Sequence, residues 1–344
     1  MSMDERTAIK NLIPYEVKDE TYVVKLDANE SMDYVALESF DISGMELYPD
    51  PESKTLRKAL SKDLGVGDRF ITMGNGSSEL LDLLFKAYLS KGDVVLSFDP
   101  SFSMYEIYAK IYEANFIKVP SREDYFLDMD EMIDRLDLNP KIILLCTPNN
   151  PTGYQIPKQD MLRLLRKTNA LVIVDEAYME FSNTGESMMD EIETYENLVV
   201  LRTFSKAYGL AGARLGYMIS NDQVTEVIKK VRSPYHVNAL SQRLGLIALS
   251  KKETIFQSVE KIKKARAFFK EALEKLGFVV YPSEGNFLFV STVIKDLGER
   301  LKEKGVLIRA FKINQNMFYR ITIRKQIDMA LCLAKIKEII DENE

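Results

Sequence analysis

The feature that most constrains the fold is an alternation of short apolar runs with helical patterns between about Ser53 and Tyr235. The apolar runs have the length of strands, are rich in β-branched residues and are bounded by turn formers. The segments between them have the apolar periodicity of amphipathic helices. Strands buried on both faces and joined through helices are typical of a mostly parallel sheet. The sequence therefore predicts an α/β fold with a mostly parallel central sheet that helices cover.

The expected elements follow from these runs. Strands are predicted at residues 69–73, 93–97, 115–119, 142–146, 171–174, 198–202 and 215–219. Helices are predicted between them at 78–88, 101–111, 129–135 and 158–168. Beyond Leu240 the pattern changes to a long Lys-rich amphipathic helix at 253–276, strands near 279, 286–290 and 318–323, and a closing helix at 326–340.

This change of pattern predicts a second, smaller α+β domain. We divide the chain into an N-terminal segment (residues 1–50), a large domain (residues 51–238) and a small C-terminal domain (residues 239–344). The N-terminal segment has few periodic signals, so we expect it to lie across a domain or subunit boundary. No linker rich in Pro or Gly separates the domains, so we expect them to pack closely.

The charge balance excludes some classes of partner. Lys and Arg total 46 against 52 for Asp and Glu, so the net charge is -6. This sign disfavours binding to nucleic acid. No apolar run reaches the roughly 18 residues of a membrane span, so we expect no membrane partner. The start of the chain lacks the apolar core of a signal peptide, which predicts a cytoplasmic protein.

The metal-binding and thiol residues are few. The two cysteines, Cys146 and Cys332, cannot form a disulfide framework and are expected to be buried, inert thiols. The single histidine, His236, excludes every multi-histidine metal site, so no metal is predicted. Catalysis must therefore use other side chains.

A segment directly after the predicted strand 198–202 combines an amine, hydroxyls and a guanidinium. Lys206 is preceded by Thr203 and Ser205, and Arg214 stands eight positions after the lysine. A lysine amine can form a Schiff base with a carbonyl, while hydroxyls and a guanidinium can bind phosphate. The segment suits an anionic ligand that carries a carbonyl. A lysine in this position is, on its own, more often a solvated surface residue.

Two more polar residues follow apolar strands. Asp175 stands just past the strand 171–174, and Asn150 lies in a turn-forming segment after the strand 142–146. Ligands of open α/β sheets bind at the carboxyl ends of the strands. Asp175 could there form an ion pair with a protonated ring nitrogen, although an isolated Asp is as well explained as a helix N-cap. Asn150 could equally be part of a simple turn.

A third strand end leads into a helix through small residues. Gly76, Ser77 and Ser78 lie between the strand 69–73 and the helix expected from Ser78. Such a junction presents backbone N–H groups and the positive end of the helix dipole, which together favour an anion. The pattern fits neither a Walker A sequence nor a dinucleotide fingerprint.

Together these segments resemble the fold-type I pyridoxal-phosphate aminotransferases, and within them the histidinol-phosphate aminotransferase branch. Four motifs occur in the order and at the spacing of that family, at residues 74–79, 149–153, 175–178 and 205–214. The resemblance extends from about Asn11 to Ile340. It implies pyridoxal 5′-phosphate as cofactor, a small-molecule amino donor, a 2-oxo acid acceptor and a homodimer with shared active sites.

The resemblance also implies roles for individual residues. Lys206 would carry the cofactor and move a proton, and Asp175 would keep the pyridine nitrogen protonated. Tyr178 and Asn150 would hydrogen-bond the phenolic oxygen of the ring, and Phe102 would stack on the ring. The phosphate would be held by Thr203, Ser205, Arg214 and the backbone at Gly76, Ser77 and Ser78.

Other implied residues concern the partner subunit and the substrate. Tyr48 resembles the tyrosine that reaches the cofactor phosphate of the partner subunit, so residues 1–50 would contribute dimer contacts and part of the small domain. Arg320 matches the arginine that binds the substrate carboxylate. The remaining substrate-side positions are Tyr15 and Arg309, at the substrate's own phosphate, together with Asn29 and Asn286.

The chain departs from the family on the substrate side. Ser31 and Met32 replace a proline and a glycine-containing turn, Arg324 and Lys325 replace a Gly-Thr pair, and the loop between Arg309 and Arg320 is short. The main prediction is amino transfer between histidinol phosphate and 2-oxoglutarate in histidine biosynthesis. An aromatic amino acid aminotransferase or a threonine-phosphate decarboxylase stays open as an alternative, and a ligand-sensing module without turnover is a further one.

Overall fold

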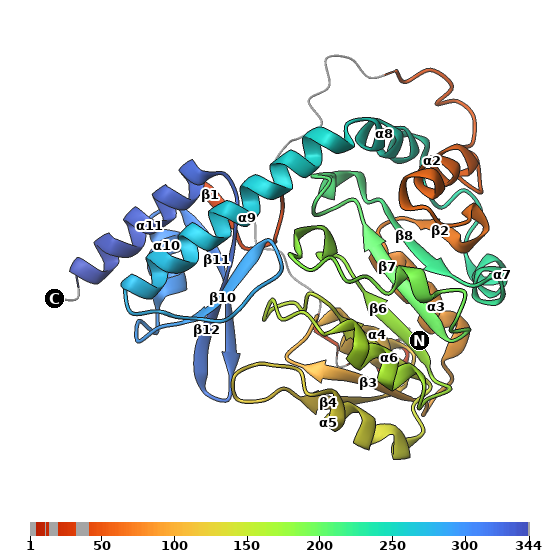
Figure 1. The fold of residues 1–344 in the computed structure, drawn as a ribbon, viewed down its shortest axis with the longest axis horizontal. Helices are drawn as coiled ribbons and strands as arrows, with labels where there is room; N and C mark the ends of the chain where they lie inside the picture. The colour runs from red at the N-terminus through yellow and green to blue at the C-terminus, as the bar shows by residue number, and fades with distance from the viewer. Residues whose placement is uncertain (1–4, 11, 14–19, 32–40, 343–344) are drawn as a thin grey trace.

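A computed structural model of the chain describes residues 5–10, 12–13, 20–31 and 41–342. Its larger sheet has seven strands in the order β2-β8-β7-β6-β5-β3-β4 (Figure 1). The strands are β2 (Ile71–Gly74), β3 (Val94–Asp99), β4 (Asn115–Pro120), β5 (Ile142–Cys146), β6 (Leu171–Asp175), β7 (Leu198–Thr203) and β8 (Gly216–Ser220). Neighbouring strands from β4 through β3, β5 and β6 to β7 pair in parallel, and β8 alone is antiparallel to both of its neighbours. The predicted α/β fold with a mostly parallel sheet is confirmed.

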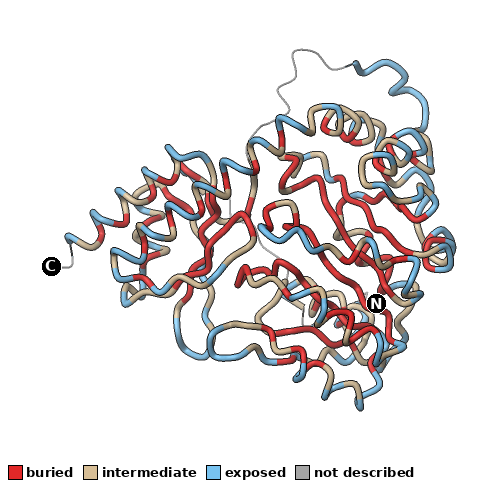
Figure 2. Tube along the Cα trace, in the orientation of Figure 1, coloured by how far each residue is buried: buried red, intermediate tan, exposed pale blue. Residues whose placement is uncertain are grey.

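Helices cover both faces of this sheet. On one face α3 (Ser77–Tyr88), α4 (Met104–Ile111) and α7 (Asp222–Val231) bury their apolar residues. On the other face lie α5 (Met129–Asp134) and α6 (Lys158–Leu165), with α2 (Lys54–Leu64) and α8 (Ala239–Ser250) packed together beside them. The strands β5 to β8 are buried along their whole length, which explains their unbroken apolar runs (Figure 2). We call this body the large-sheet unit.

The second sheet has five strands in the order β1-β11-β12-β10-β9. Its strands are β1 (Val24–Leu26), β9 (Val279–Val280), β10 (Phe287–Ser291), β11 (Val306–Ile313) and β12 (Asn316–Thr322). The helices α10 (Leu297–Glu303) and α11 (Gln326–Asp341) pack beside it, and α9 (Lys252–Lys275) runs from the large-sheet unit along it (Figure 1). We call this body the small-sheet unit. Its α+β character is as predicted.

The N-terminal segment joins both units. The short helix α1 (Thr7–Lys10) packs against α4 of the large-sheet unit, whereas β1 pairs in parallel with β11 of the small-sheet unit. The pairing places Leu26 opposite Ile308, so the residues after β1 enter the space between the two units. No periodic pattern in the sequence identifies a three-residue strand, because its hydrogen bonds come from a partner far along the chain.

Several element boundaries differ from those predicted. The strand expected from residue 69 starts with the 3₁₀ turn η1 (Asp68–Phe70), and the helix expected at 101–111 begins only at Met104. The helix expected at 158–168 ends at Leu165, and the helix expected from Ser78 begins at Ser77. Such ends depend on capping contacts, which periodicity does not report. Among the described residues, no helix combines the length and apolar character that crossing a membrane requires.

Candidate active site

The carboxyl ends of β5, β6 and β7 meet at one edge of the large sheet. Strand register places Cys146 opposite Asp175, and Asp175 opposite Leu201. At the same edge, Thr203 of β7 and Gly74 of β2 both lie opposite Gly216 of β8. The motifs that follow these strands are therefore brought together by the sheet itself.

Lys206 lies at this edge, half-buried beside Ala28 and Tyr178. Its Nζ donates a hydrogen bond to the carbonyl oxygen of Ala28 at 2.8 Å and stands 5.6 Å from the centre of the Tyr178 ring. Burial, followed by the charge of Arg320, lowers the pKa of Lys206 to about 7. A large fraction of the amine is then neutral near neutral pH, which is the form that attacks a carbonyl.

Asp175 is a buried carboxylate held by neutral donors. Tyr105 donates its hydroxyl to Asp175 Oδ2 at 2.8 Å, and the backbone N–H of Ala177 donates to Oδ1 at 3.2 Å. Burial raises the pKa of Asp175, although the hydrogen bond from Tyr105 opposes the shift. A buried carboxylate is stabilised most by a cation placed directly against it. A protonated ring nitrogen would fill that role.

Tyr178 connects the large-sheet unit to the N-terminal segment. Its hydroxyl accepts a hydrogen bond from Asn29 Nδ2 at 3.1 Å, and its ring packs edge-on against Phe287, with 5.0 Å between the ring centres. Asn29 is fully buried, has a positive φ of 53° and also bonds Thr322 of β12. The predicted residues Tyr178 and Asn29 are thus in contact.

A corner suited to an anion, called the anion corner, lies at the start of α3. The first turn of this helix is preceded by Gly76, whose φ is 82° and which offers no side-chain cap. A Cβ on Gly76 would stand 2.7 Å from Arg214 Nη2, so the guanidinium fits directly over the glycine. A Cβ on Gly216 would stand 2.4 Å from the backbone nitrogen of Ser77, so the start of β8 lies directly against the first turn of α3. Uncapped N–H groups beside an arginine are suited to a phosphate.

The other residues predicted to bind the phosphate come from the end of β7 and the segment after it, and from the first turn of α3. Thr203 and Ser205 are buried, and the hydroxyl of Thr203 accepts a hydrogen bond from the Ser205 N–H at 3.0 Å. Ser78 is half-buried in the first turn of α3. Arg214 itself is exposed, has a φ of 47° and donates to the carbonyl of Ala211.

Arg320 and Asn150 join the two units across the site. Arg320, on β12, donates to Asn150 Oδ1 at 2.5 Å and to the carbonyl of Asp27. Both side chains are buried, with 8% and 9% exposure. Arg309 on β11 lies directly opposite Arg320 in the sheet and is exposed. Because direct cross-strand neighbours share a face, both arginines point to the same side.

Asn286 has an unsatisfied atom. Its Nδ2 donates to the carbonyl of Asn29 at 3.2 Å, while its Oδ1 is buried without a hydrogen-bond partner among the described residues. Buried polar atoms of this kind usually find a partner, so a ligand donor would complete the residue. Phe102 is half-buried and packs edge-on against Tyr105, with 5.5 Å between the ring centres.

Tyr48 and His236 lie apart from this cluster. Tyr48 is 81% exposed and stacks on Tyr235, with 4.5 Å between the ring centres. Tyr15 lies outside the described residues. His236 Nδ1 lies 2.8 Å from Glu79 Oε2, so it contacts α3 and has no bond to the groups above.

Sequence reasoning missed several groups that line the site. Tyr105 follows Phe102 on the same motif, but nothing in the spacing shows that its hydroxyl reaches Asp175. The carbonyls of Asp27 and Ala28 were missed because they enter the site only through the pairing of β1 with β11. Thr322 of β12 was missed because its partner, Asn29, is far away in the sequence.

A lysine with a lowered pKa, a buried carboxylate that forms no ion pair with any described residue, and an anion corner without a side-chain cap form one connected region. They suit a cofactor that carries a carbonyl, a protonated ring nitrogen and a phosphate. The fold and the site thus define a transferase of the pyridoxal-phosphate-dependent class.

The chain belongs to the class I and II aminotransferases. A family model described as aminotransferase class I and II matches residues 18–333. The chain is 38% identical over 342 residues to the histidinol-phosphate aminotransferase of Clostridium novyi (strain NT), covering 95% of this chain and 96% of that protein. It is 40% identical over 316 residues to the histidinol-phosphate aminotransferase of Caldanaerobacter subterraneus subsp. tengcongensis, covering 89% of each chain.

A solved structure has the same fold. The histidinol-phosphate aminotransferase of Sinorhizobium meliloti, in complex with pyridoxal-5′-phosphate, superposes with a TM-score of 0.92 at 23% identity, covering 100% of this chain and 99% of that one. Family membership makes this protein a pyridoxal-phosphate-dependent aminotransferase that acts on an amino donor and a 2-oxo acid. The lysine, carboxylate and anion corner described above fit that cofactor.

Proposed function

We propose that the protein interconverts histidinol phosphate plus 2-oxoglutarate with imidazole-acetol phosphate plus glutamate, in histidine biosynthesis. The observation that carries the proposal is the shared name of the relatives, which match at 38% and 40% identity over most of their length. The arrangement of cationic side chains on the small sheet supports it.

The pair formed by Arg309 and Arg320 favours a substrate with a phosphate. Two like charges on directly opposed residues repel one another unless an anion lies between them. Histidinol phosphate has no carboxylate on its amine-bearing carbon, so its phosphate must satisfy the arginines, whereas glutamate offers a carboxylate in the opposite half of the reaction. A guanidinium pair can accept both anions. Tyr15 would add a hydroxyl to the phosphate.

The proton-handling groups are Lys206 and Asp175. When bound, pyridoxal phosphate supplies an electron-accepting ring that stabilises negative charge at the substrate α-carbon. Lys206, with a pKa of about 7, would move a proton between the substrate α-carbon and the C4′ carbon of the cofactor. Asp175 would hold the proton on the ring nitrogen, and Tyr178 and Asn150 would donate hydrogen bonds to the phenolic oxygen.

The other predicted residues orient the reactants. We assign the cofactor phosphate to Thr203, Ser205, Arg214 and the N–H groups at Gly76, Ser77 and Ser78. Phe102 would pack on the ring of the cofactor, and Asn29 and Asn286 would line the substrate side. A homodimer in which Tyr48 reaches the phosphate of the partner subunit, and a cytoplasmic location, belong to the same proposal.

Absorbance of the purified protein tests the function directly. We expect a visible band from bound cofactor that histidinol phosphate bleaches and 2-oxoglutarate restores, while phenylalanine at the same concentration leaves it unchanged. Arg309→Gln should weaken the response to histidinol phosphate by roughly ten-fold or more, since it removes one charged hydrogen-bonding partner of the phosphate, and should change the response to glutamate less.

The other outcomes separate the alternatives. Equal bleaching by phenylalanine would make the protein an aromatic amino acid aminotransferase. Release of carbon dioxide from threonine phosphate would identify a decarboxylase. A protein that binds the cofactor but exchanges no amino group with any of these compounds would contradict the proposal and favour a ligand-sensing role.

A further inference from the structure

One position of helix α9 breaks the pattern of its neighbours. The buried residues of the helix recur every three or four positions, at Ile255, Val259, Ile262, Arg266, Phe269 and Leu273. All but one are apolar, as expected for a stripe that faces a core. Arg266 is the exception, and only 6% of it is exposed. Because burying a charge is costly without specific partners, this residue needs a specific reason to be there.

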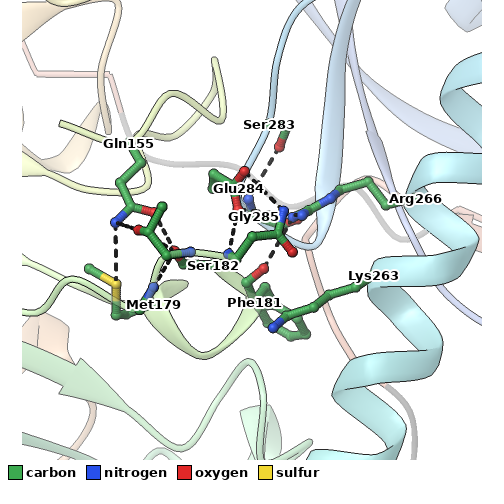
Figure 3. A network of polar contacts seen from close by, with 12 residues as sticks. Gln155, Met179, Phe181, Ser182, Lys263, Arg266, Ser283, Glu284 and Gly285 are labelled. Carbon is green, nitrogen blue, oxygen red and sulfur yellow. Dashed lines mark hydrogen bonds and ion pairs between the residues drawn. The ribbon is translucent and has the colours of Figure 1, made fainter. Parts of the chain in front are cut away.

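The partners of Arg266 belong to different units (Figure 3). Its Nη1 donates to the carbonyl oxygen of Gly285 at 2.6 Å and to that of Phe181 at 3.3 Å. Gly285 precedes β10 of the small-sheet unit, while Phe181 ends the 3₁₀ turn η3 (Met179–Phe181), which follows β6 of the large-sheet unit. A single guanidinium nitrogen therefore ties the two units together.

Glu284 completes the connection. Its Oε2 lies 3.5 Å from Arg266 Nη2 and accepts the backbone N–H of Asn183 at 2.6 Å, and its Oε1 accepts Asn183 Nδ2 at 3.1 Å. The backbone N–H of Glu284 also donates to the carbonyl of Gly153 at 2.9 Å. These bonds again cross from the small-sheet unit to the large one. We call this group, formed by Arg266, Glu284 and their contacts, the Arg266–Glu284 link.

Both ends of the link adjoin the candidate site. Asn286 follows Gly285 directly, and the N–H of Phe181 donates to the carbonyl of Tyr178 at 3.0 Å. The ring of Tyr178 in turn rests on Phe287, the residue after Asn286. Moving the carbonyls of Phe181 and Gly285 apart would therefore move Tyr178 and Asn286 apart.

We propose that Arg266 is a positioning residue, which holds the segment of Tyr178 against the segment of Asn286 and so fixes the cofactor side of the site relative to the substrate side. The inference rests on the proposed function, in which Tyr178 donates to the cofactor and Asn286 lines the substrate side. Arg266 acts through these two segments and touches neither reactant.

The test replaces Arg266 with Met, which suits the apolar stripe, and with Lys, which keeps the charge but offers one nitrogen on a shorter reach. The matched control is Arg300→Met. Arg300 of α10 also bonds a carbonyl and a carboxylate, those of Ile339 and Glu342, and both lie in the C-terminal part of the small-sheet unit. All variants are assayed as holoenzymes.

In Arg266→Met we expect the pH midpoint of the cofactor's visible absorbance to rise by about half a unit or more, because a displaced Tyr178 stabilises the ionised ring oxygen less. The ratio kcat/KM should fall roughly ten-fold or more, mostly through kcat. Hydrogen exchange should increase together in residues 178–184 and 283–287. For Arg266→Lys, the absorbance midpoint, kcat/KM and hydrogen exchange should all lie between those of the wild type and of Arg266→Met. Arg300→Met should show none of these changes.

If Arg266→Met does not fold, Glu284→Ala serves in its place. Glu284 lies nearer the surface, so its removal is better tolerated, and the substitution removes the bonds from Glu284 to Arg266 and Asn183 that connect the same segments. Its absorbance midpoint should shift in the same direction. The inference is overturned if Arg266→Met, or Glu284→Ala in its place, keeps the wild-type midpoint and exchange pattern, or if Arg300→Met shifts them equally. A wild-type protein without a visible band would instead contradict the proposed function.

Discussion

Asp175 shows how a residue depends on a hydroxyl from another element. Tyr105 is 1% exposed, and the pKa of its own hydroxyl is raised by burial and by the neighbouring carboxylate, so it stays a donor at every ordinary pH. That donor opposes the effect of burial on Asp175. Tyr105 therefore favours the ionised carboxylate, which is the form that can hold a protonated ring nitrogen.

Replacing Tyr105 with Phe should weaken binding of pyridoxal phosphate. Loss of the hydrogen bond raises the pKa of Asp175 further above its ordinary value, so as the pH is lowered the carboxylate becomes protonated earlier than in the wild type. We expect affinity to fall roughly ten-fold at neutral pH, with the decline on the acid side beginning at higher pH. Titration of the apoprotein with cofactor across a pH series, followed by absorbance, measures both effects.

Tyr112→Phe is the matched control. Tyr112 caps the same helix and donates to the carboxylate of Asp82 at 2.9 Å, so the substitution also removes a tyrosine–carboxylate bond. Its cofactor titration should match that of the wild type. Equal curves for both variants would show that Tyr105 does not tune Asp175.

At the scale of elements, a buried ion-pair network holds the ends of β6 and β7 together. Arg202 of β7 contacts Glu176, at 2.7 Å, just after β6 and Glu180, at 3.0 Å, in η3. Glu176 is fully buried and also accepts hydrogen bonds from Ser187 and from the N–H of Met188. This network fixes the segment that carries Asp175 and Tyr178.

Arg202→Leu should destabilise the protein strongly, because two carboxylates lose the cation that offsets their burial. The loss of a buried partner costs about 3–5 kcal/mol. In urea, the unfolding midpoint followed by circular dichroism should fall markedly. Arg69→Leu, which breaks the exposed pair with Asp222, should leave that midpoint nearly unchanged. Equal midpoints for the two variants would mean that the network does not hold these strand ends.

At the scale of the whole molecule, residues 41–48 present apolar side chains to solvent. Ile42, Leu47 and Tyr48 are 66%, 68% and 81% exposed, and Figure 1 shows that this segment reaches out beyond α2 and α8. Grouped exposed apolar residues commonly mark a protein interface. This exposure supports the proposed homodimer. The domain boundaries at residues 50 and 238 stay a prediction.

Mixing two inactive variants tests whether subunits share their active sites. Lys206→Ala lacks the reactive amine, and Tyr48→Ala lacks the side chain proposed to reach the partner. A hybrid dimer regains one site in which both residues are intact. After refolding together at equal amounts, about a quarter of wild-type activity should return, since half of the dimers are hybrids with one restored site. Activity no greater than the average of the separate variants would contradict shared sites.

The sequence by itself determined the α/β class, the central strands and the chemistry at their ends. These are local properties: a run such as Ile142–Cys146 is apolar because it is buried on both faces, and polar residues placed just after such runs must meet at one edge of a parallel sheet. Lys206, Asp175 and Asn150 could be found in this way, and the family resemblance added their roles.

Only the tertiary structure decided which distant groups complete the site. The pairing of β1 with β11 brings Asn29 to Tyr178 and the carbonyl of Ala28 to Lys206, and packing sets the hydroxyl of Tyr105 on Asp175. Arg266 could have been noticed as a charge in an apolar stripe, but its two carbonyl partners could not. Contacts between residues of different elements depend on how those elements and the two sheets pack, and no local pattern of residues encodes that geometry.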